Sequence, residues 1–490
     1  MPAAKPDGQA LRATRLDGRW DRVAIALFVG ALLLGLTRFV RLGEWSLWID
    51  EALSLSDALH GDAPINPLGY WLIGLCARAA DGRPDEWLLR ILPACFGYAT
   101  IPLCAWAFRP VAGGRASAAA ALVLAASSWH LYWSQNARFY TLAALLVLLG
   151  TGLVLRGFAK GRGALAIFGL AVAATSALAH PTALLVPIGI ILAAPTLMAL
   201  RVGLHRRVTW AVAAVGGLAL LLGLGWLGDL VDRWQSLRGS GNPAHFVLTA
   251  GYHITPTLAA AFSLGLAWAI HRRHRGMFLA AAVAIIGFGA AFGTSIAARM
   301  TAQYAFALLP FIALVAVAPF ASRDPLAPAL AKPARTDWGA ATTGWFSAAL
   351  LVLALVPALV STVLYLTVRH GERPRWREAY AHVFENRRPG DIVFGMAAPI
   401  GEYYLTARRS QVREPVELVY LDRFRADVPE RWDRRGRRAW FVLNEEELYD
   451  WSPTQRAKMR RILREDCRLV ARFPLEVESR DLSVWVYVRE

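Results

Sequence analysis

Charged residues are scarce in this sequence. They make up only 18% of its 490 residues, whereas a soluble globular domain carries about 25%. The acidic residues (36) are also fewer than the basic ones (53). Hydrophobic residues make up 56% of the chain, and they form successive runs of about 20 residues, long enough to cross a bilayer. This composition excludes a soluble globular protein and predicts a mostly α-helical, polytopic membrane protein.

Cysteine is rare as well, and so are the patterns that hold cofactors. The four cysteines, Cys76, Cys95, Cys104 and Cys467, show no spacing typical of metal ligands. Three of them lie in the apolar part of the chain and one in the C-terminal part, so we expect no disulfide framework. The C-terminal part has no glycine-rich phosphate loop, and the glycines of "GDIVFGMAAPIGEYY" are expected to serve turns.

The net charge of +17 suggests nucleic acid as a partner, but the positions of the basic residues argue against it. Arg and Lys cluster in the short segments between apolar runs, where positive charge marks the cytoplasmic side of a membrane. The clusters are Arg109 and Arg115; Arg156, Lys160 and Arg162; Arg201, Arg206 and Arg207; Arg272, Arg273 and Arg275; and Arg323, Lys332 and Arg335. We therefore interpret the charge as a topology signal, with the lipid bilayer as partner.

The apolar runs predict eleven crossings of a plasma membrane, starting from a cytoplasmic N-terminus. They are expected near 22–40, 86–108, 116–132, 138–156, 163–180, 181–200, 208–228, 246–270, 276–297, 303–321 and 340–368. The loops 41–85 and 229–245 and the tail after 368 then lie outside. Segment 66–80 is too short to cross, because a spanning helix needs at least roughly 17 residues. We expect an interfacial helix there, with Asn66 as N-cap and Pro67 in the first turn.

Residues 369–490 change in character, which predicts a separate extracytoplasmic α/β domain. In "RWREAYAHVFENRRPGDIVF", Trp376, Tyr380 and Val383 have helical spacing, and an apolar strand follows the Pro-Gly pair. Further strands are expected at 416–421, 439–443, 468–473 and 482–488, with a helix near 453–465. The predicted domains are a transmembrane domain, 1–368, and a small C-terminal domain, 369–490.

Two adjacent carboxylates, Asp50 and Glu51, follow the first span in "WSLWIDEALS". They could simply be solvated residues at the start of an interfacial helix, where acids suit the helix dipole. However, polar and basic side chains return to the same outer face from distant segments. These are Arg90 in "LLRILP", Asn136, Arg138 and Tyr140 in "SQNARFY", His180, and Arg299, Gln303 and Tyr304 in "AARMTAQYAFALLP". An anionic ligand with an acid beside it explains both kinds of charge.

In their order and sidedness these motifs resemble the GT-C membrane glycosyltransferases. After the acid pair come "PLGYW" on a short helix, "LRILP", "SQNARFY" and a late "YAFALLP", and the tail opens with a tryptophan and "PGDIVF". The chain is similar over its whole length to bacterial members akin to protein O-mannosyltransferases and to the aminoarabinose transferase of lipid A. The resemblance implies a polyprenyl-phosphate sugar as donor, transfer on the extracytoplasmic face and usually inversion at the anomeric carbon.

The resemblance also implies roles for the outer-face residues. Asp50 is expected to be the base for the acceptor hydroxyl, with Glu51 in support. Arg138, together with Arg90 and Tyr140, is expected at the donor phosphate, since a guanidinium is always charged and can donate two hydrogen bonds. The candidate cavity residues are His180, Asn136, Arg299, Gln303 and Tyr304. No ligand cluster demands a metal, although Asp50 and Glu51 could hold a divalent ion with water.

Four of these candidates have a structural alternative. Arg138 could be an interfacial arginine that extends toward the headgroups, and Arg90 could pair with a nearby acid. Tyr140 could belong to the aromatic belt of the membrane interface, and His180 could cap a helix.

Two positions depart from the pattern of the resembling family. The chain reads Ile65-Asn66-Pro67-Leu68 where relatives often carry Lys or His before paired prolines, and Asn136 stands where many carry an acid. The donor head group therefore stays open, and the acceptor could be a protein, a lipid or a polysaccharide. A lipid-linked-sugar transporter, a ligase that uses a lipid pyrophosphate donor, and a binding subunit that acts through its tail remain as alternatives.

Overall fold

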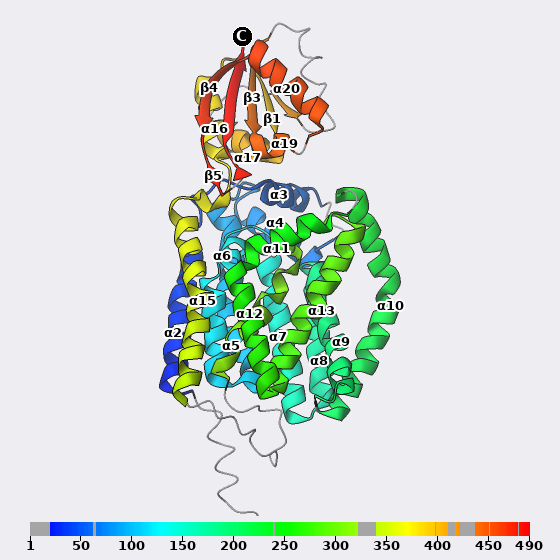
Figure 1. Ribbon diagram of the computed structural model, residues 1–490. Helices are drawn as coiled ribbons and strands as arrows, with labels where there is room; N and C mark the ends of the chain where they lie inside the picture. Colours follow the sequence, from blue (N-terminus) through cyan, green and yellow to red (C-terminus); the bar gives the residue numbers. More distant parts are fainter. Residues whose placement is uncertain are drawn as a thin grey trace, which may run out of the picture.

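The computed structural model describes residues 20–490 apart from 62–64, 203, 239–240, 322–339, 397, 410–416, 422–436, 450 and 479. It shows a bundle of long helices with a small mixed sheet beyond one end (Figure 1). We call this end of the bundle the sheet end. The cluster Arg323, Lys332 and Arg335, which we predicted on the cytoplasmic side, and the N-terminal residues 1–19 lie outside the described residues.

Seven helices among the described residues are long and apolar enough to span a membrane, and a bent pair can add an eighth. The seven are Arg22–Phe39 (α2 and η1), Glu86–Ala126 (α5), Tyr140–Lys160 (α7), Pro181–Ala199 (η3 and α9), Arg206–Gln235 (in α10), Arg275–Ala297 (α13) and Gly344–Thr367 (in α15). The bent pair is α11 (Pro243–Ile254) and α12 (Pro256–Arg272), at 84° to each other. The chain is a multi-pass membrane protein, but the count of eleven spans is not confirmed.

Helix α5 reverses its direction at Gly113, whose φ of 79° and ψ of 175° are open only to glycine. The contacts of α5 with residues 20–39 run in opposite senses on the two sides of this residue. Before the break, Tyr98 packs on Phe39 and Arg109 lies over Trp20. After it, Arg115 pairs with Asp21, and the backbone carbonyl of Ala125 accepts a hydrogen bond from Arg38 of η1. The expected spans 86–108 and 116–132 thus share one helix that folds back on itself.

Two other predicted spans are shorter helices. The segment 163–180 forms α8 (Gly163–Ala174) and η2 (Thr175–Leu178), and 303–321 forms η4 (Ala302–Leu308), α14 (Leu309–Ala316) and η5 (Ala318–Phe320).

The predicted outer loop 229–245 is wrong over most of its length. Helix α10 (Arg206–Arg238) continues through it, because no glycine or proline occurs between Asp229 and Arg238 to end the helix.

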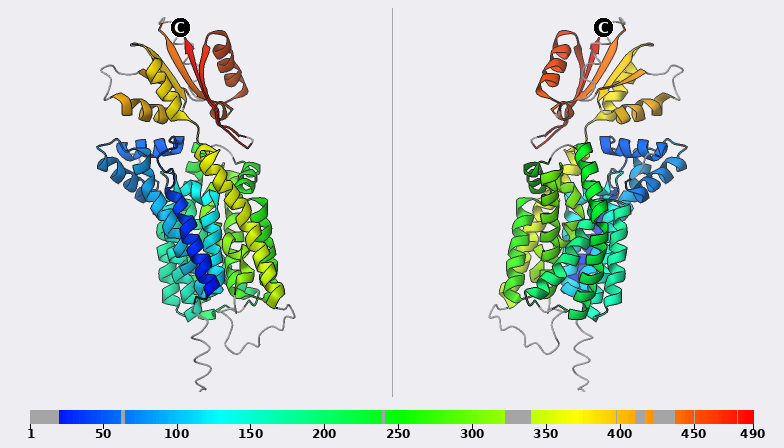
Figure 2. Two further views of the ribbon diagram at one scale, coloured as in Figure 1. Left: turned by 90° about the vertical axis from the view of Figure 1, so that its left-hand side faces the viewer. Right: turned by 90° about the vertical axis from the view of Figure 1, so that its right-hand side faces the viewer.

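Two amphipathic helices lie at the sheet end, between the bundle and the sheet (Figure 2). They are α3 (Ile49–His60), which carries the acid pair in its first turn, and α4 (Pro67–Ala79). Helix α4 is the predicted interfacial segment, and its 13 residues are too few to span a bilayer. Asn66 occupies its N-cap in the left-handed region (φ 68°), but its side chain makes no capping hydrogen bond.

The C-terminal part is an α/β unit, as predicted. Its five-stranded sheet has the order β2-β1-β3-β7-β4, with β1 parallel to β2 and β3 and with β7 antiparallel to β3 and β4. The strands are β1 (Ile392–Met396), β2 (Glu417–Leu421), β3 (Ala439–Asn444), β4 (Arg468–Phe473) and β7 (Val484–Arg489), with a separate hairpin of β5 (Glu476–Val477) and β6 (Arg480–Asp481). The helices are α16 (Trp376–Asn386), α17 (Ala398–Arg409), α19 (Glu445–Tyr449) and α20 (Pro453–Glu465). Every predicted strand is present. Three of them show the patterns from which strands are predicted: β1 and β3 are buried along their whole length, and β7 alternates between buried and half-buried residues.

Candidate active site

Glu51 is completely buried between two arginines from distant parts of the chain. Its Oε1 and Oε2 accept hydrogen bonds of 2.8 Å each from Nε and Nη2 of Arg90, and Arg373 Nε lies 3.4 Å from Oε2. Burial alone would raise the pKa of Glu51, but the two positive charges and the hydrogen bonds lower it to about 2. Glu51 is therefore ionised throughout the physiological pH range.

The same carboxylate joins α3 to the turn before α7. As the third residue of α3, Glu51 accepts a hydrogen bond from the backbone N–H of Trp48 at 2.9 Å, as in a capping box. Its Oε1 also accepts the backbone N–H of Ala137 at 2.7 Å. Arg90 in turn donates to the carbonyls of Trp45 and Ser46, both at 2.9 Å. This network fixes the position of the acid pair relative to the "SQNARFY" segment.

Two residues of this network were missed in the sequence. Arg373, which follows α15, donates to the carbonyl of Gln135 at 2.7 Å, and Gln135 Nε2 donates to the carbonyl of Val40, also at 2.7 Å. Arg373 is an arginine on the expected outer side, the same signal that pointed to Arg138. It was not singled out because several other arginines lie near it at the start of the tail.

Asp50 and Arg138 form a second, looser pair at the surface of this network. Arg138 Nη2 lies 3.9 Å from Asp50 Oδ2, and the two side chains are 12% and 14% exposed. Arg138 Nη1 donates to the Asp50 carbonyl at 3.2 Å and to the hydroxyl of Ser54. Its Nε has no hydrogen-bond partner among the described residues. Burial would lower the pKa of Arg138, but the nearby acid Asp50 raises it above the usual value.

An aromatic stack brings together three of the predicted cavity residues. The ring of Tyr140, at the start of α7, stacks on His180 with centroids 4.6 Å apart. His180 stacks in turn on Tyr304 of η4 at 5.8 Å, and Trp234 of α10 packs on Tyr304 at 4.9 Å. His180 also caps η3 (Pro181–Leu184) by accepting the N–H of Thr182. The expected capping role is therefore present together with the stacking.

The other predicted cavity residues are placed less directly. Asn136 is fully buried, and neither its amide nitrogen nor its amide oxygen has a partner among the described residues. Gln303 adjoins Tyr304 in η4, and Arg299 lies between α13 and η4. Both of these side chains are partly exposed.

The described residues include no group of three or more His, Cys, Asp or Glu side chains placed to hold a metal ion. Both oxygens of Glu51 are already engaged by Arg90 and by backbone N–H groups. Asp50 and Glu51 therefore do not present a shared pair of free oxygens to a divalent ion. All four cysteines are free thiols.

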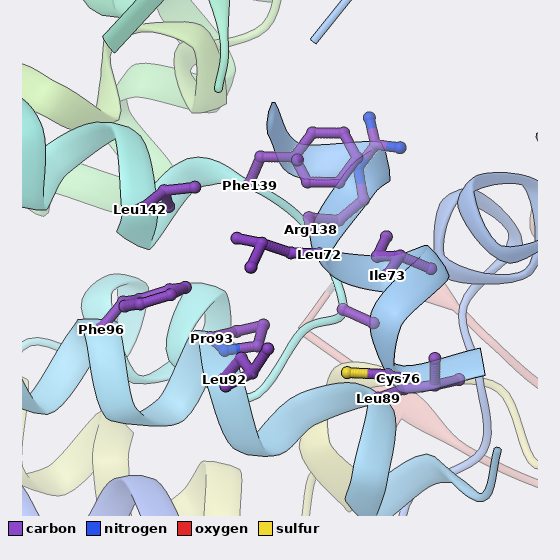
Figure 3. A pocket seen from close by; sticks show the side chains of 12 residues that line it. Leu72, Ile73, Cys76, Leu89, Leu92, Pro93, Phe96, Arg138, Phe139 and Leu142 are labelled. Atoms are coloured by element: carbon purple, nitrogen blue, oxygen red, sulfur yellow. The ribbon is translucent and has the colours of Figure 1, made fainter. Parts of the chain in front are cut away.

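A narrow apolar groove lies between α4, α5 and the start of α7 (Figure 3). Leu72 and Ile73 line one side of it, and Leu92 and Phe96 line the other. Arg138 stands at one end of the groove, with its guanidinium beyond the ring of Phe139 in the close-up (Figure 3). The groove thus combines hydrocarbon walls with a cation at its end.

No protein-family model and no curated protein matches the chain by sequence. By structure, it is similar to ArnT from Cupriavidus metallidurans bound to undecaprenyl phosphate, with a TM-score of 0.51 and 18% identity over 95% of this chain and 97% of ArnT. It is also similar to the oligosaccharyltransferase from Archaeoglobus fulgidus tethered with an acceptor peptide, with a TM-score of 0.51 and 12% identity over 87% and 69% of the two chains. Both are GT-C membrane glycosyltransferases. The chain has the GT-C fold.

The resemblance predicted from the sequence motifs is thus confirmed at the level of the fold. The match to ArnT covers nearly the whole of both chains, so the GT-C fold here includes the helical bundle and most of the C-terminal α/β unit. The match to the oligosaccharyltransferase leaves about a third of that larger protein unmatched.

Proposed function

We propose that this protein is a glycosyltransferase that moves a sugar from a polyprenyl-phosphate donor to an acceptor at the extracytoplasmic face of the membrane. The observation that carries the proposal is the Asp50–Arg138 pair. An acid and a cation lie side by side, partly exposed, at the sheet end of a GT-C fold. The reaction needs these two kinds of group, a base for the acceptor hydroxyl and a cation for the departing phosphate.

The geometry of Arg138 supports a role at the donor phosphate. Its separation from Asp50 of 3.9 Å is too long for a hydrogen bond, and its Nε is unpartnered among the described residues. Nε is also buried, so a shift of the side chain is needed to present the Nε–Nη2 edge to a phosphate for two hydrogen bonds. The groove that ends at Arg138 has the apolar walls that a polyprenyl chain needs, and it must widen to admit isoprene units. The ArnT structure of the same fold contains undecaprenyl phosphate.

In the proposed reaction the acceptor oxygen attacks the anomeric carbon while its proton passes to Asp50. The bond between the anomeric carbon and the phosphate oxygen breaks, and polyprenyl phosphate leaves with the bonding electrons. Arg138 stabilises the charge that grows on the phosphate as this bond breaks. Phosphate binding also draws Arg138 away from Asp50, which leaves the carboxylate free to accept the proton.

Glu51 and Arg90 fit a positioning role better than contact with substrate. Both side chains are completely buried, and they bond to each other and to backbone groups. They hold Asp50 on α3 and Arg138 in the turn before α7 at a fixed separation. Tyr140, His180 and Tyr304 are proposed to line the sugar site, and the unpartnered amide of Asn136 is proposed to bind a donor hydroxyl or phosphate oxygen.

The C-terminal domain, 369–490, is proposed to shape acceptor access without taking part in the transfer chemistry. Its α17 contacts the segment just before α3, since the hydroxyl of Tyr404 accepts the N–H of Leu47 at 2.7 Å.

The proposed topology keeps eleven crossings. The reversal in α5, the bent pair α11–α12 and the two short apolar helices Gly163–Leu178 and Ala302–Ala316 supply the four beyond seven.

Two alternatives are less well supported. A ligase with a lipid pyrophosphate donor would resemble the oligosaccharyltransferase, but the chain covers only 69% of that protein, against 97% of ArnT. A lipid-linked-sugar transporter needs no acid beside a cation on one face of the membrane, and its functional charges are usually found near mid-membrane.

The test compares Asp50→Asn and Arg138→Ala in one assay with a synthetic polyprenyl-phosphate sugar. Asp50→Asn should lower turnover by roughly 10²–10⁴-fold and leave donor binding largely intact, because only the proton acceptor is lost. Arg138→Ala should weaken donor binding about 10- to 100-fold, as expected for a lost charged hydrogen bond, and also slow the transfer.

Matched controls exist close to both residues. Asp57→Asn changes another half-buried acid of α3, and Arg78→Ala removes an exposed arginine of α4. Both should keep near-normal turnover and donor binding. Near-normal turnover of Asp50→Asn with the correct substrates would refute the proposed base.

A further inference from the structure

Two arginines lie near the end of the bundle opposite the sheet end. Helices α5 and α7 both begin at the sheet end and run toward the other end (Figure 1). At about 1.5 Å per residue, Arg109 lies roughly 35 Å along α5 from Glu86, and Arg156 lies roughly 24 Å along α7 from Tyr140. Both arginines are therefore on the side of the membrane away from the candidate active site.

One side of α7 faces the lipid, and Arg156 is part of it. Leu149 is 38% exposed, Leu153 and Arg156 are half-buried, and Lys160 is exposed. These residues follow one another at intervals of three or four, so they share one face of the helix. Arg156 thus lies one turn deeper in the membrane than Lys160, which ends α7.

Pro110 provides the acceptor that holds Arg156 against α5. Since proline has no N–H, the carbonyl of Trp106, four residues earlier, has no donor within the helix. Nη2 of Arg156 donates to this carbonyl at 2.9 Å, and Nη1 donates to the carbonyl of Gly152 at 2.8 Å. The guanidinium also lies 3.6 Å from the centroid of the Trp106 ring. These contacts fix the orientation of the cation, but two neutral carbonyls do not compensate its charge.

Arg109 places a second positive charge next to Arg156. The charge of Arg109 acts on Arg156, so the two guanidinium groups are close enough to repel each other. Arg109 is half-buried and lies over the ring of Trp20, 5.8 Å from its centroid. Each arginine is thus held on a tryptophan ring, and the two cations are neighbours.

No acid among the described residues pairs with either arginine. The sequence from Trp87 to Gly228, which includes most of α5 and all of α7, contains no Asp or Glu. Asp21, the N-cap of α2, lies at this end of the bundle but pairs with Arg115 at 2.5 Å. Like charges repel, and taking them partly out of water is costly unless an anion compensates them. The arrangement therefore lacks an anion.

We infer that Arg109 and Arg156 bind the phosphate of an anionic phospholipid from the leaflet at this end of the bundle. The phosphate supplies the missing negative charge and accepts N–H groups from both guanidinium groups. An acyl chain of the same lipid lies along Leu153 and Leu149, on the lipid-facing side of α7. Basic sites between membrane helices bind anionic head groups in this way. The inference does not depend on the proposed transfer reaction.

The lipid joins two helices that also lead to the candidate active site. The sheet end of α5 carries Arg90, and Arg138 comes shortly before α7. Because a ligand that binds only the folded protein stabilises it, the lipid should raise the melting temperature of the protein.

The experiment titrates the delipidated, full-length protein in detergent with dioleoyl phosphatidylglycerol, followed by native mass spectrometry. Dioleoyl phosphatidylcholine is the comparison lipid, because it has the same chains and a phosphate but no net charge. The first phosphatidylglycerol should bind about tenfold more tightly than the first phosphatidylcholine, the gain expected from one hydrogen bond to a charged group. It should also raise the melting temperature more than phosphatidylcholine does.

Two double variants form a matched pair. Arg109→Gln/Arg156→Gln removes both cations of the site, whereas Arg162→Gln/Arg206→Gln removes the same charge from two exposed positions at the same end of the bundle. The first should lose the preference for phosphatidylglycerol, and the second should keep it. Arg109→Gln alone should lower the preference by several-fold. This single variant guards against a folding defect, because the bonds to the carbonyls of α5 and α7 come from Arg156.

Equal affinities for the two lipids, or equal losses in the two double variants, would overturn the site and leave only the general attraction of a basic surface for anionic lipid. Displacement of the bound phosphatidylglycerol by an excess of inorganic phosphate would overturn the lipid assignment in favour of a soluble anion. None of these measurements requires turnover, so their result is independent of whether the protein transfers a sugar.

Discussion

Glu51→Gln is the substitution that best separates positioning from chemistry in this site. Glutamine keeps the shape of the side chain but removes the charge that compensates Arg90 and Arg373, both of which are completely buried. Breaking a buried ion pair by removing one partner typically costs about 3–5 kcal/mol. We expect a loss of this size in the free energy of unfolding of Glu51→Gln.

The neighbouring residue provides the contrast. Asp50 is partly exposed and its pair with Arg138 is loose, so Asp50→Asn should lose turnover and little stability. Glu44→Gln is the matched control for stability, because Glu44 pairs with Arg41 in the same loop but is 56% exposed. An exposed pair of this kind is worth about 0.2–1 kcal/mol. The double variant Glu51→Gln/Arg373→Met should recover part of the loss, because it removes one of the two uncompensated cations.

The assay is unfolding in SDS titrations followed by tryptophan fluorescence, together with donor binding and turnover of each variant. The pH dependence of stability gives a second measure. Because the folded pKa of Glu51 is about 2, below the usual 4.5, its stabilising contribution is complete above about pH 4.5 and is lost as the pH falls toward 2. This dependence should be absent in Glu51→Gln. If Glu51→Gln unfolded like the wild type and yet lost turnover as completely as Asp50→Asn, the positioning role would be refuted.

Two further predictions concern the placement of the tail. The first uses a background without the four native cysteines. A cysteine at Glu402 should react with a membrane-impermeant maleimide added outside cells, and a cysteine at Lys160 should react only after lysis. Reaction of both in intact cells would contradict the proposed topology. The second is Tyr404→Phe, which removes the hydroxyl that accepts the N–H of Leu47 and donates to Glu86 at 2.9 Å. It should cost about 1–3 kcal/mol in unfolding free energy and leave the chemical step of single-turnover transfer unchanged. Loss of the chemical step at full stability would mean that the tail takes part in the chemistry.

The sequence by itself determined the class of the protein and most of its elements. Apolar runs identify membrane helices because the bilayer requires a fixed length of hydrocarbon-compatible chain. The strands of the tail were also predicted correctly, because a buried strand is a short apolar run and a half-buried strand alternates apolar and polar residues. Both patterns are visible within a few residues of sequence. The same local reading failed at 229–245, where the polar end of α10 resembles a loop in composition but has no residue that breaks the helix before Arg238.

The tertiary structure alone decided which of two adjacent acids is buried. Asp50 and Glu51 are neighbours in the sequence, yet one faces Arg138 near the surface and the other is enclosed by Arg90 and Arg373. The same holds for the arginines, since Arg90 and Arg138 look alike in the sequence. The physical reason is that a charge takes its role from its partners and its exposure. Here the partners come from α5, from the turn before α7 and from the segment after α15, and only folding brings these segments together.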